Sequence, residues 1–373
     1  MKAKENIRNS NHELMRIISM NFIVLGHVLL YGNMLNSTNV TMNTIYKLLE
    51  YTLIIHVPSF VLLTGYYQSK SSFKQSKVWQ ILNEVWFYKF LFLIIFLSLG
   101  LISLSKVELI KELTPFPYDY WYIKCYLLLF FVSPFLNKLI NSLNQKEFKK
   151  LIVLGFFIFC VIPALTGGEL FENDGYTLYQ FIYLYFVGAY LRLYPLEDSY
   201  IFKKTSKEMF KIIMIIIFFS CIILNFLIYS YGVKIADVNN LFSYISNLIG
   251  ISTLNYSSPI ITIQAIAYFS FFTTISIKSK FINSCSALTL GVYIIHENIF
   301  LKKYLYGVLG FTRKNVNDSR MIINVLLATI IIYIICSIIE WLRQRIFQFI
   351  YNRNISKKIR NYYYQWLHKL VKE

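Results

Sequence analysis

Long apolar runs, separated by short polar patches, extend along most of the chain. Many of them contain roughly 18 to 25 residues, enough for an α-helix to cross the hydrocarbon core of a bilayer. The pattern therefore predicts an all-α, polytopic integral membrane protein. We expect about ten transmembrane helices, at residues 14–32, 45–67, 81–105, 121–140, 150–166, 177–195, 211–231, 259–277, 287–305 and 321–342.

Composition and charge agree with this interpretation and add an orientation. Hydrophobic residues make up 56% of the 373 positions and charged residues only 15%, so the net charge of +18 belongs to an apolar chain. Most lysines and arginines fall at the N-terminus, in alternate loops and in the last thirty residues, which predicts that both termini lie inside the cell. We expect anionic lipid, and no nucleic acid, as the partner of this basic charge.

The chain divides into a ten-span membrane domain, residues 1–342, and a basic amphipathic cytoplasmic tail, residues 343–373. The first apolar run is long, contains Arg16 and His27 and lacks a small-residue cleavage pattern, so we expect an uncleaved span instead of a signal peptide. The five cysteines occur singly, without the paired spacing of a disulfide framework or a zinc site. We expect no metal.

Candidate chemistry begins with Arg16 and His27, which lie eleven residues apart within the first predicted span. Eleven residues are close to three helical turns, so both side chains point the same way with a rise of about 16 Å between them. His56 and His296 also fall well inside predicted spans, and Glu297 follows His296 directly. Ionisable residues inside a bilayer usually mark a functional site, although neighbours on a helix diverge by about 100°.

Several segments together resemble integral-membrane acyltransferase family 3. They are the Arg-x10-His spacing, HVPSFVLLTGYY at 56–67, DYWYIKCYLLLFFVSPFL at 119–136 and LGVYIIH at 290–296, in the family's order. The chain departs mildly from the family at Thr64, where serine is usual, and at Tyr122, where phenylalanine is common. The resemblance extends to about residue 342. It implies about ten spans and the transfer of acetyl or other acyl groups from cytoplasmic acyl-CoA to hydroxyls of sugars or cell-surface glycans.

The resemblance and the chemistry of acyl transfer suggest roles for individual residues. A neutral imidazole is a suitable base for a hydroxyl near pH 7, so His27 is the predicted base, with a transient acyl-histidine as the open alternative. The other candidates are His296 and Glu297 for orienting His27 or the substrate hydroxyl, Arg16, Lys70 and Lys74 for binding CoA phosphates, and His56, Trp121 and Tyr122 for contacting the acceptor.

Most of these residues also have a structural interpretation, which for His27 is a histidine that hydrogen-bonds a neighbouring helix. Arg16, Lys70 and Lys74 are placed as the positive-inside rule requires, and Trp121 and Tyr122 suit an interfacial belt. His56 precedes Pro58, which frees a backbone carbonyl that needs a polar partner. Together with Gly65, Pro58 is typical of an interrupted span that lines a cavity.

The sequence thus favours a membrane O-acyltransferase that acts on a cell-surface polysaccharide or its lipid-linked precursor. Acetyl-CoA is the favoured donor because acetyl is the commoner acyl group in the family. The abundant Lys, Ile, Asn and Tyr codons indicate an AT-rich, bacterial genome, and we expect a multi-pass plasma-membrane protein of undetermined oligomeric state. The rival interpretation is a polysaccharide exporter, flippase or polymerase-type protein. The chain lacks the large arginine-rich loop and the internal repeats that would favour it.

Overall fold

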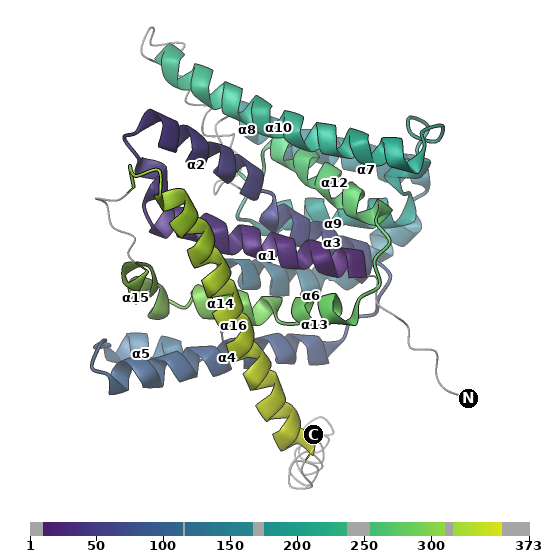
Figure 1. The fold of residues 1–373 in the computed structure, drawn as a ribbon. Coiled ribbons are helices and arrows are strands. Elements are labelled where there is room, and N and C mark those ends of the chain that lie inside the picture. The colour runs from purple at the N-terminus through teal and green to yellow at the C-terminus, as the bar shows by residue number, and fades with distance from the viewer. Residues whose placement is uncertain (1–9, 115, 167–174, 237–253, 310–315, 353–373) are drawn as a thin grey trace, which may run out of the picture.

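The computed structural model describes residues 10–114, 116–166, 175–236, 254–309 and 316–352, which form helices and turns without any strand (Figure 1). The all-α prediction is confirmed for this part of the chain. The main helices are α1 (Ser10–Tyr31), α2 (Val40–Leu53), α3 (His56–Gln68), α4 (Gln75–Ser98), α5 (Lys106–Leu113), α6 (Trp121–Ser142), α7 (Gln145–Phe156), α8 (Ile162–Thr166), α9 (Leu178–Leu193), α10 (Lys207–Ala236), α12 (Pro259–Thr274), α13 (Lys280–Ser286), α14 (Thr289–His296), α15 (Leu301–Val308) and α16 (Met321–Asn352).

Among the described residues, seven helical segments are long and apolar enough to cross a membrane. One of them joins α2 and α3, and another joins α7 and α8 through a short π-helical segment, Phe157–Val161. The α13–α15 region would be an eighth if it is counted as one broken span. Helices α9 and α12 have sixteen residues each, below the usual spanning length. The count of ten is not confirmed, and the inside position of both termini stays a prediction.

Helix α1 lies in the middle of the bundle, between α3, α12, α14 and α16 (Figure 1). Its apolar residues pack on more than one side, as expected of a helix that is surrounded by others. Helices α10 and α12 pack together on one side of this centre, and α4 and α5 lie on the opposite side. Arg16 and His27 are therefore carried by the helix that has most neighbours in the fold.

The closest helix pair, α3 and α9, packs backbone to backbone through glycine. A Cβ atom added to Gly65 would overlap the carbonyl oxygen of Tyr185, and one added to Gly188 would overlap that of Leu62. Small residues permit this close approach, as in other membrane helix pairs. Gly65 was expected to help line a cavity. The structure instead places it in this helix contact, while the preceding Thr64 lines a cavity.

The predicted span 287–305 is not one straight helix. Helix α14 ends at His296, and α15 leaves the break at an angle of 94° to the α13–α14 segment. Glu297 has non-helical backbone angles, and the side-chain oxygen of Asn298 accepts hydrogen bonds from the backbone N–H groups of Phe300 and Leu301. The carboxamide thus caps the start of the second arm.

Helix α16 runs without interruption past the expected domain boundary at residue 342 and ends at Asn352. Near that boundary, both carboxylate oxygens of the buried Glu340 accept hydrogen bonds from Arg343, each at 2.7 Å. Tyr88 of α4 also donates to Glu340, so α16 is tied to α4 at this point. Residues 353–373, the greater part of the expected amphipathic tail, lie outside the described residues.

Candidate active site

Three of the predicted catalytic residues meet at the break after α14. The Nδ1 atom of His27 lies 2.9 Å from Nε2 of His296 and 3.1 Å from Oε1 of Glu297. His296 is fully buried, and His27 and Glu297 are partly buried. His296 is the last residue of α14 and Glu297 is its C-cap, so both side chains lie at the point where the helix ends. The structure thus brings together three of the residues that the sequence proposes for the chemistry.

The hydrogen bonds of His296 define which nitrogen of His27 is free. Nδ1 of His296 lies 2.6 Å from the carbonyl oxygen of Val292, and because a carbonyl can only accept, this nitrogen carries the proton. In neutral His296 the Nε2 atom is then an acceptor, so the bond between the rings is donated by Nδ1–H of His27. Neutral His27 is left with a lone pair on Nε2, which is the form that a general base requires.

Glu297 links His27 to two residues that the sequence did not single out. Its Oε2 accepts a hydrogen bond from the Tyr31 hydroxyl at 3.3 Å and lies 3.5 Å from Nζ of Lys302. Tyr31 follows His27 by one helical turn, which is a spacing that brings it to the same face. Lys302 lies on α15, and the bend brings it back towards Glu297. The spacing from His27 was therefore an available signal for Tyr31, whereas Lys302 required the bend to be known.

A cavity of about 300 Å³ adjoins His27. His56 lines the same cavity, and its Nδ1 is buried without a hydrogen-bond partner among the described residues. The other lining groups include the polar side chains of Glu50 and Asn255 and the rings of Tyr176 and Tyr256. This combination of aromatic faces and hydrogen-bonding groups suits a polar, ring-shaped ligand.

Trp121 does not line this cavity but supports its aromatic wall. Its ring centroid lies 4.4 Å from that of Tyr176 and 5.9 Å from that of Tyr256, with which it is stacked. The predicted acceptor contact of Trp121 is therefore indirect in this structure. His56 also contacts this aromatic wall, since its ring centroid lies 5.7 Å from that of Tyr256.

Arg16 lines a second cavity, of about 200 Å³, between α1, α3, α4, α6 and α14. Tyr122 also lines it, so this residue lies on the Arg16 side instead of the His27 side. Tyr293 of the same lining contacts the His296 ring at a centroid distance of 6.1 Å and thus lies between the second cavity and the histidine pair. Lys70 and Lys74, the other predicted phosphate ligands, are exposed beyond α3 and line neither cavity.

The same three groups are also of metal-ligating types. One ligand atom from each of His27, His296 and Glu297 lies within 4.8 Å of the other two. The separations of 2.9 and 3.1 Å match hydrogen-bonding and ion-pair contacts, and Lys302 already adds a positive charge beside the carboxylate. We therefore interpret the cluster as an acid–base arrangement.

Comparison with known proteins gives one match. A family model described as an acyltransferase domain, of the acyltransferase 3 type, matches residues 9–341. This match includes all the residues of both cavities and the histidine pair. No curated protein and no solved structure matches the chain.

Proposed function

The chain belongs to the acyltransferase 3 family, and from this premise we propose that it is an O-acyltransferase of a bacterial plasma membrane. The donor is an acyl-CoA, acetyl-CoA in the first instance, and the acceptor is a hydroxyl of a cell-surface polysaccharide or of its lipid-linked precursor. The observation that carries the proposal is the contact of His27 with His296 and Glu297 beside a cavity lined by His56.

The Arg16 cavity is the proposed entrance of the donor. A guanidinium keeps its charge and can bind a phosphate in a bidentate manner, which suits the phosphates of CoA. Arg16 and His27 are separated by a rise of about 16 Å along α1. The long pantetheine arm would cross this separation and bring the thioester past Tyr293 to His27. Lys70 and Lys74 stay candidates for phosphates that project beyond the cavity.

In the proposed reaction, Nε2 of His27 accepts the proton of the acceptor hydroxyl while its oxygen attacks the thioester carbonyl. The C–O bond forms, the C–S bond breaks, and the departing thiolate takes the proton back from the imidazolium. Nδ1–H of His27 is held by His296, so the base is oriented before the substrates bind. The Glu297 carboxylate, 3.1 Å from Nδ1, stabilises the positive charge that develops on the ring.

The cavity beside His27 is the proposed acceptor site. Tyr176 and Tyr256 offer aromatic faces to a sugar ring, and Glu50, Asn255 and His56 offer groups that hydrogen-bond its hydroxyls. Lys47 forms an ion pair with Glu50 at 2.8 Å, so the carboxylate is balanced by a cation. The site therefore does not require a positively charged acceptor.

The decisive experiment compares surface glycan from cells that express the native chain, a His27→Ala variant at equal abundance, or neither. Mass spectrometry of the glycan identifies the acyl group and its sugar. Acylation that depends on the native chain and is lost with His27→Ala would support the proposal. Equal acylation in all three, with a changed amount of exported glycan, would instead favour the exporter interpretation.

The same cells distinguish direct transfer from a covalent route. Because an acyl-imidazole hydrolyses quickly in acid, the chain is denatured and digested at neutral pH and low temperature after a pulse of labelled acetate, which preserves an acyl group on His27 if one forms. A mass increase on the peptide that contains His27 would identify the acyl-histidine route, whereas an unmodified peptide during active transfer would support the general-base route.

A further inference from the structure

We propose that Tyr120 is a positioning residue for the reaction, because it holds both arms of the broken helix that carries His296 and Glu297. The proposal rests on the function proposed above. Tyr120 touches neither cavity and lies immediately before α6, in the segment that follows α5. It acts on the chemistry only through the backbone on which the catalytic side chains are mounted.

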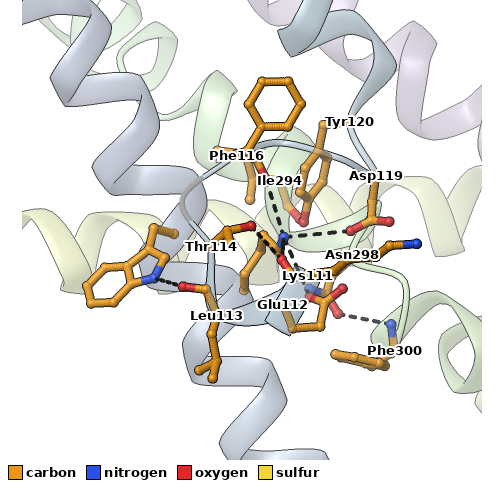
Figure 2. A network of polar contacts seen from close by, with 12 residues as sticks. Lys111, Glu112, Leu113, Thr114, Phe116, Asp119, Tyr120, Ile294, Asn298 and Phe300 are labelled. Carbon is orange, nitrogen blue, oxygen red and sulfur yellow. Dashed lines mark hydrogen bonds and ion pairs between the residues drawn. The ribbon is translucent and has the colours of Figure 1, made fainter. Parts of the chain in front are cut away.

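The first arm of the bend is held through a backbone carbonyl. The hydroxyl of Tyr120 donates a hydrogen bond of 3.0 Å to the carbonyl oxygen of Ile294, two residues before His296 (Figure 2). Ile294 lies in the last turn of α14, where carbonyl groups lack the next turn of helix as a partner. Tyr120 is 1% exposed, so water does not replace this donor.

The second arm is held through Asn298. The Asn298 side chain lies beside the Tyr120 hydroxyl, and its oxygen accepts hydrogen bonds from the N–H groups of Phe300 at 3.1 Å and Leu301 at 3.3 Å. One phenol thus contacts the end of α14 and the residue that caps α15. Between these two contacts stand only Ile295, His296 and Glu297. A shift of the phenol changes the separation between His27 and both of its partners.

Tyr120 is in turn fixed by a buried charge. Lys89 of α4 is 1% exposed, and its ammonium donates hydrogen bonds to the carbonyl oxygens of Lys111 at 3.0 Å and Phe116 at 3.4 Å (Figure 2). The carboxylates of Glu112 and Asp119 lie 3.8 and 4.0 Å from the same nitrogen. Asp119 immediately precedes Tyr120. The ammonium therefore binds several groups of the segment between α5 and α6, and these contacts fix the position of Tyr120 at the end of that segment.

The test uses Tyr120→Phe, which removes one hydroxyl and keeps the ring. Its matched control is Tyr304→Phe, which removes another tyrosine hydroxyl bonded to a backbone carbonyl, that of Leu101, at 2.9 Å. That bond joins α15 to the segment that follows α4. It is exposed, so water can replace it. Both full-length variants are compared with the native chain in membranes at equal abundance.

Two readouts are expected to change together. The rate constant for CoA release from acetyl-CoA, with surface glycan of the same cells as acceptor, falls about tenfold for Tyr120→Phe, with an unchanged KM for acetyl-CoA. Hydrogen exchange of the amides of Phe300 and Leu301 becomes faster, because the cap loses its support. Tyr304→Phe changes neither quantity.

The proposal is overturned if Tyr120→Phe transfers acyl groups at the native rate, if the amides at the bend exchange as in the native chain, or if Tyr304→Phe has the same effects. A rise in the KM for acetyl-CoA without a change in kcat also contradicts it, since that result places Tyr120 in donor binding. Failure of the proposed function would look different, because His27→Ala would then leave acylation intact.

Discussion

The buried ammonium of Lys89 allows a quantitative prediction about stability. Replacing Lys89 with methionine keeps a side chain of similar length and apolar character but removes the charge. The backbone carbonyls of Lys111 and Phe116 each lose one of two donors, since the Thr114 hydroxyl and the Tyr118 N–H also donate to them. The carboxylate of Glu112, 3.8 Å away and only 5% exposed, loses its nearest cation. The substitution therefore leaves the buried Glu112 carboxylate without its ion-pair partner.

The expected loss in the free energy of unfolding follows from the interactions that Lys89→Met removes. Hydrogen bonds from a charged group contribute about 1.5 to 3 kcal/mol each, and breaking a buried ion pair on one side costs about 3 to 5 kcal/mol. The ion-pair distances here are long and Asp119 is partly exposed, so the lower end applies. We expect Lys89→Met to lower the free energy of unfolding by about 3 kcal/mol. Lys106→Met, at an exposed position of α5, is the control.

The loss has a predictable dependence on pH. Burial raises the pKa of Glu112, and the Lys89 ammonium opposes that rise. Without the cation the pKa of Glu112 rises further, so the folded variant favours the protonated carboxyl. A carboxyl whose pKa is raised by folding stabilises the folded state at low pH, and this contribution disappears as the pH rises through the folded-state pKa. The deficit of Lys89→Met is therefore expected to be larger at pH 8 than at pH 5.

Unfolding of the purified chain in mixed detergent and dodecyl sulfate, followed by circular dichroism, measures these free energies. The companion variant Lys89→Met/Glu112→Gln removes the unpaired carboxylate and is expected to recover part of the loss and to abolish its pH dependence. A Lys89→Met chain within about 1 kcal/mol of the native one at both pH values would refute the reasoning, because a buried ion pair broken on one side should cost more.

Three further outcomes are expected. Glu297→Gln lowers kcat for acyl transfer by roughly ten- to hundredfold with little change in the KM for acyl-CoA, because the carboxylate stabilises the His27 imidazolium only as it forms. Steady-state kinetics measures kcat and KM separately. Arg16→Lys raises the KM for acyl-CoA more than it lowers kcat, because the bidentate guanidinium is lost. A KM equal to that of the native chain would exclude bidentate phosphate binding by Arg16. Gly65→Ala destabilises the fold by about 1 to 3 kcal/mol, because its Cβ overlaps the Tyr185 carbonyl. Gly307→Ala, whose Cβ meets no atom within 4 Å, leaves the stability unchanged. Unfolding in detergent compares the two variants.

The sequence was sufficient to predict an all-helical membrane protein, its family and the meeting of His27, His296 and Glu297. Apolar run length and buried ionisable residues are local features, so they can be read from the chain directly. The spacing of Arg16 and His27 predicted that both side chains point the same way, and the structure has each of them line a different cavity. Tyr122 lines the Arg16 cavity whereas Trp121 packs behind the wall of the other, and this difference depends on the tilt and rotation of α6, which the sequence does not specify.

Two features of the site had no local signal. The span 287–305 contains neither proline nor a glycine at Glu297–Phe300, the residues by which helix breaks are usually recognised. Lys89 lies in an apolar run and was assigned to a span without a role, since its partners at Lys111, Phe116 and Asp119 are 22 to 30 positions further along the chain. Both features are produced by contacts between distant segments.

The helix break after α14 and the polar contacts around it together determine the surroundings of His27. His296 and Glu297 are consecutive residues at the end of α14, and Nδ1 of His27 lies 2.9 Å from the first and 3.1 Å from the second. The helix ends at this point, and a helix end inside a protein needs partners for its last carbonyl groups. Tyr120 provides one partner, Asn298 begins the second arm, and the bend then brings Lys302 to within 3.5 Å of Glu297. The surroundings of the histidine pair thus depend on polar anchors that lie elsewhere in the fold.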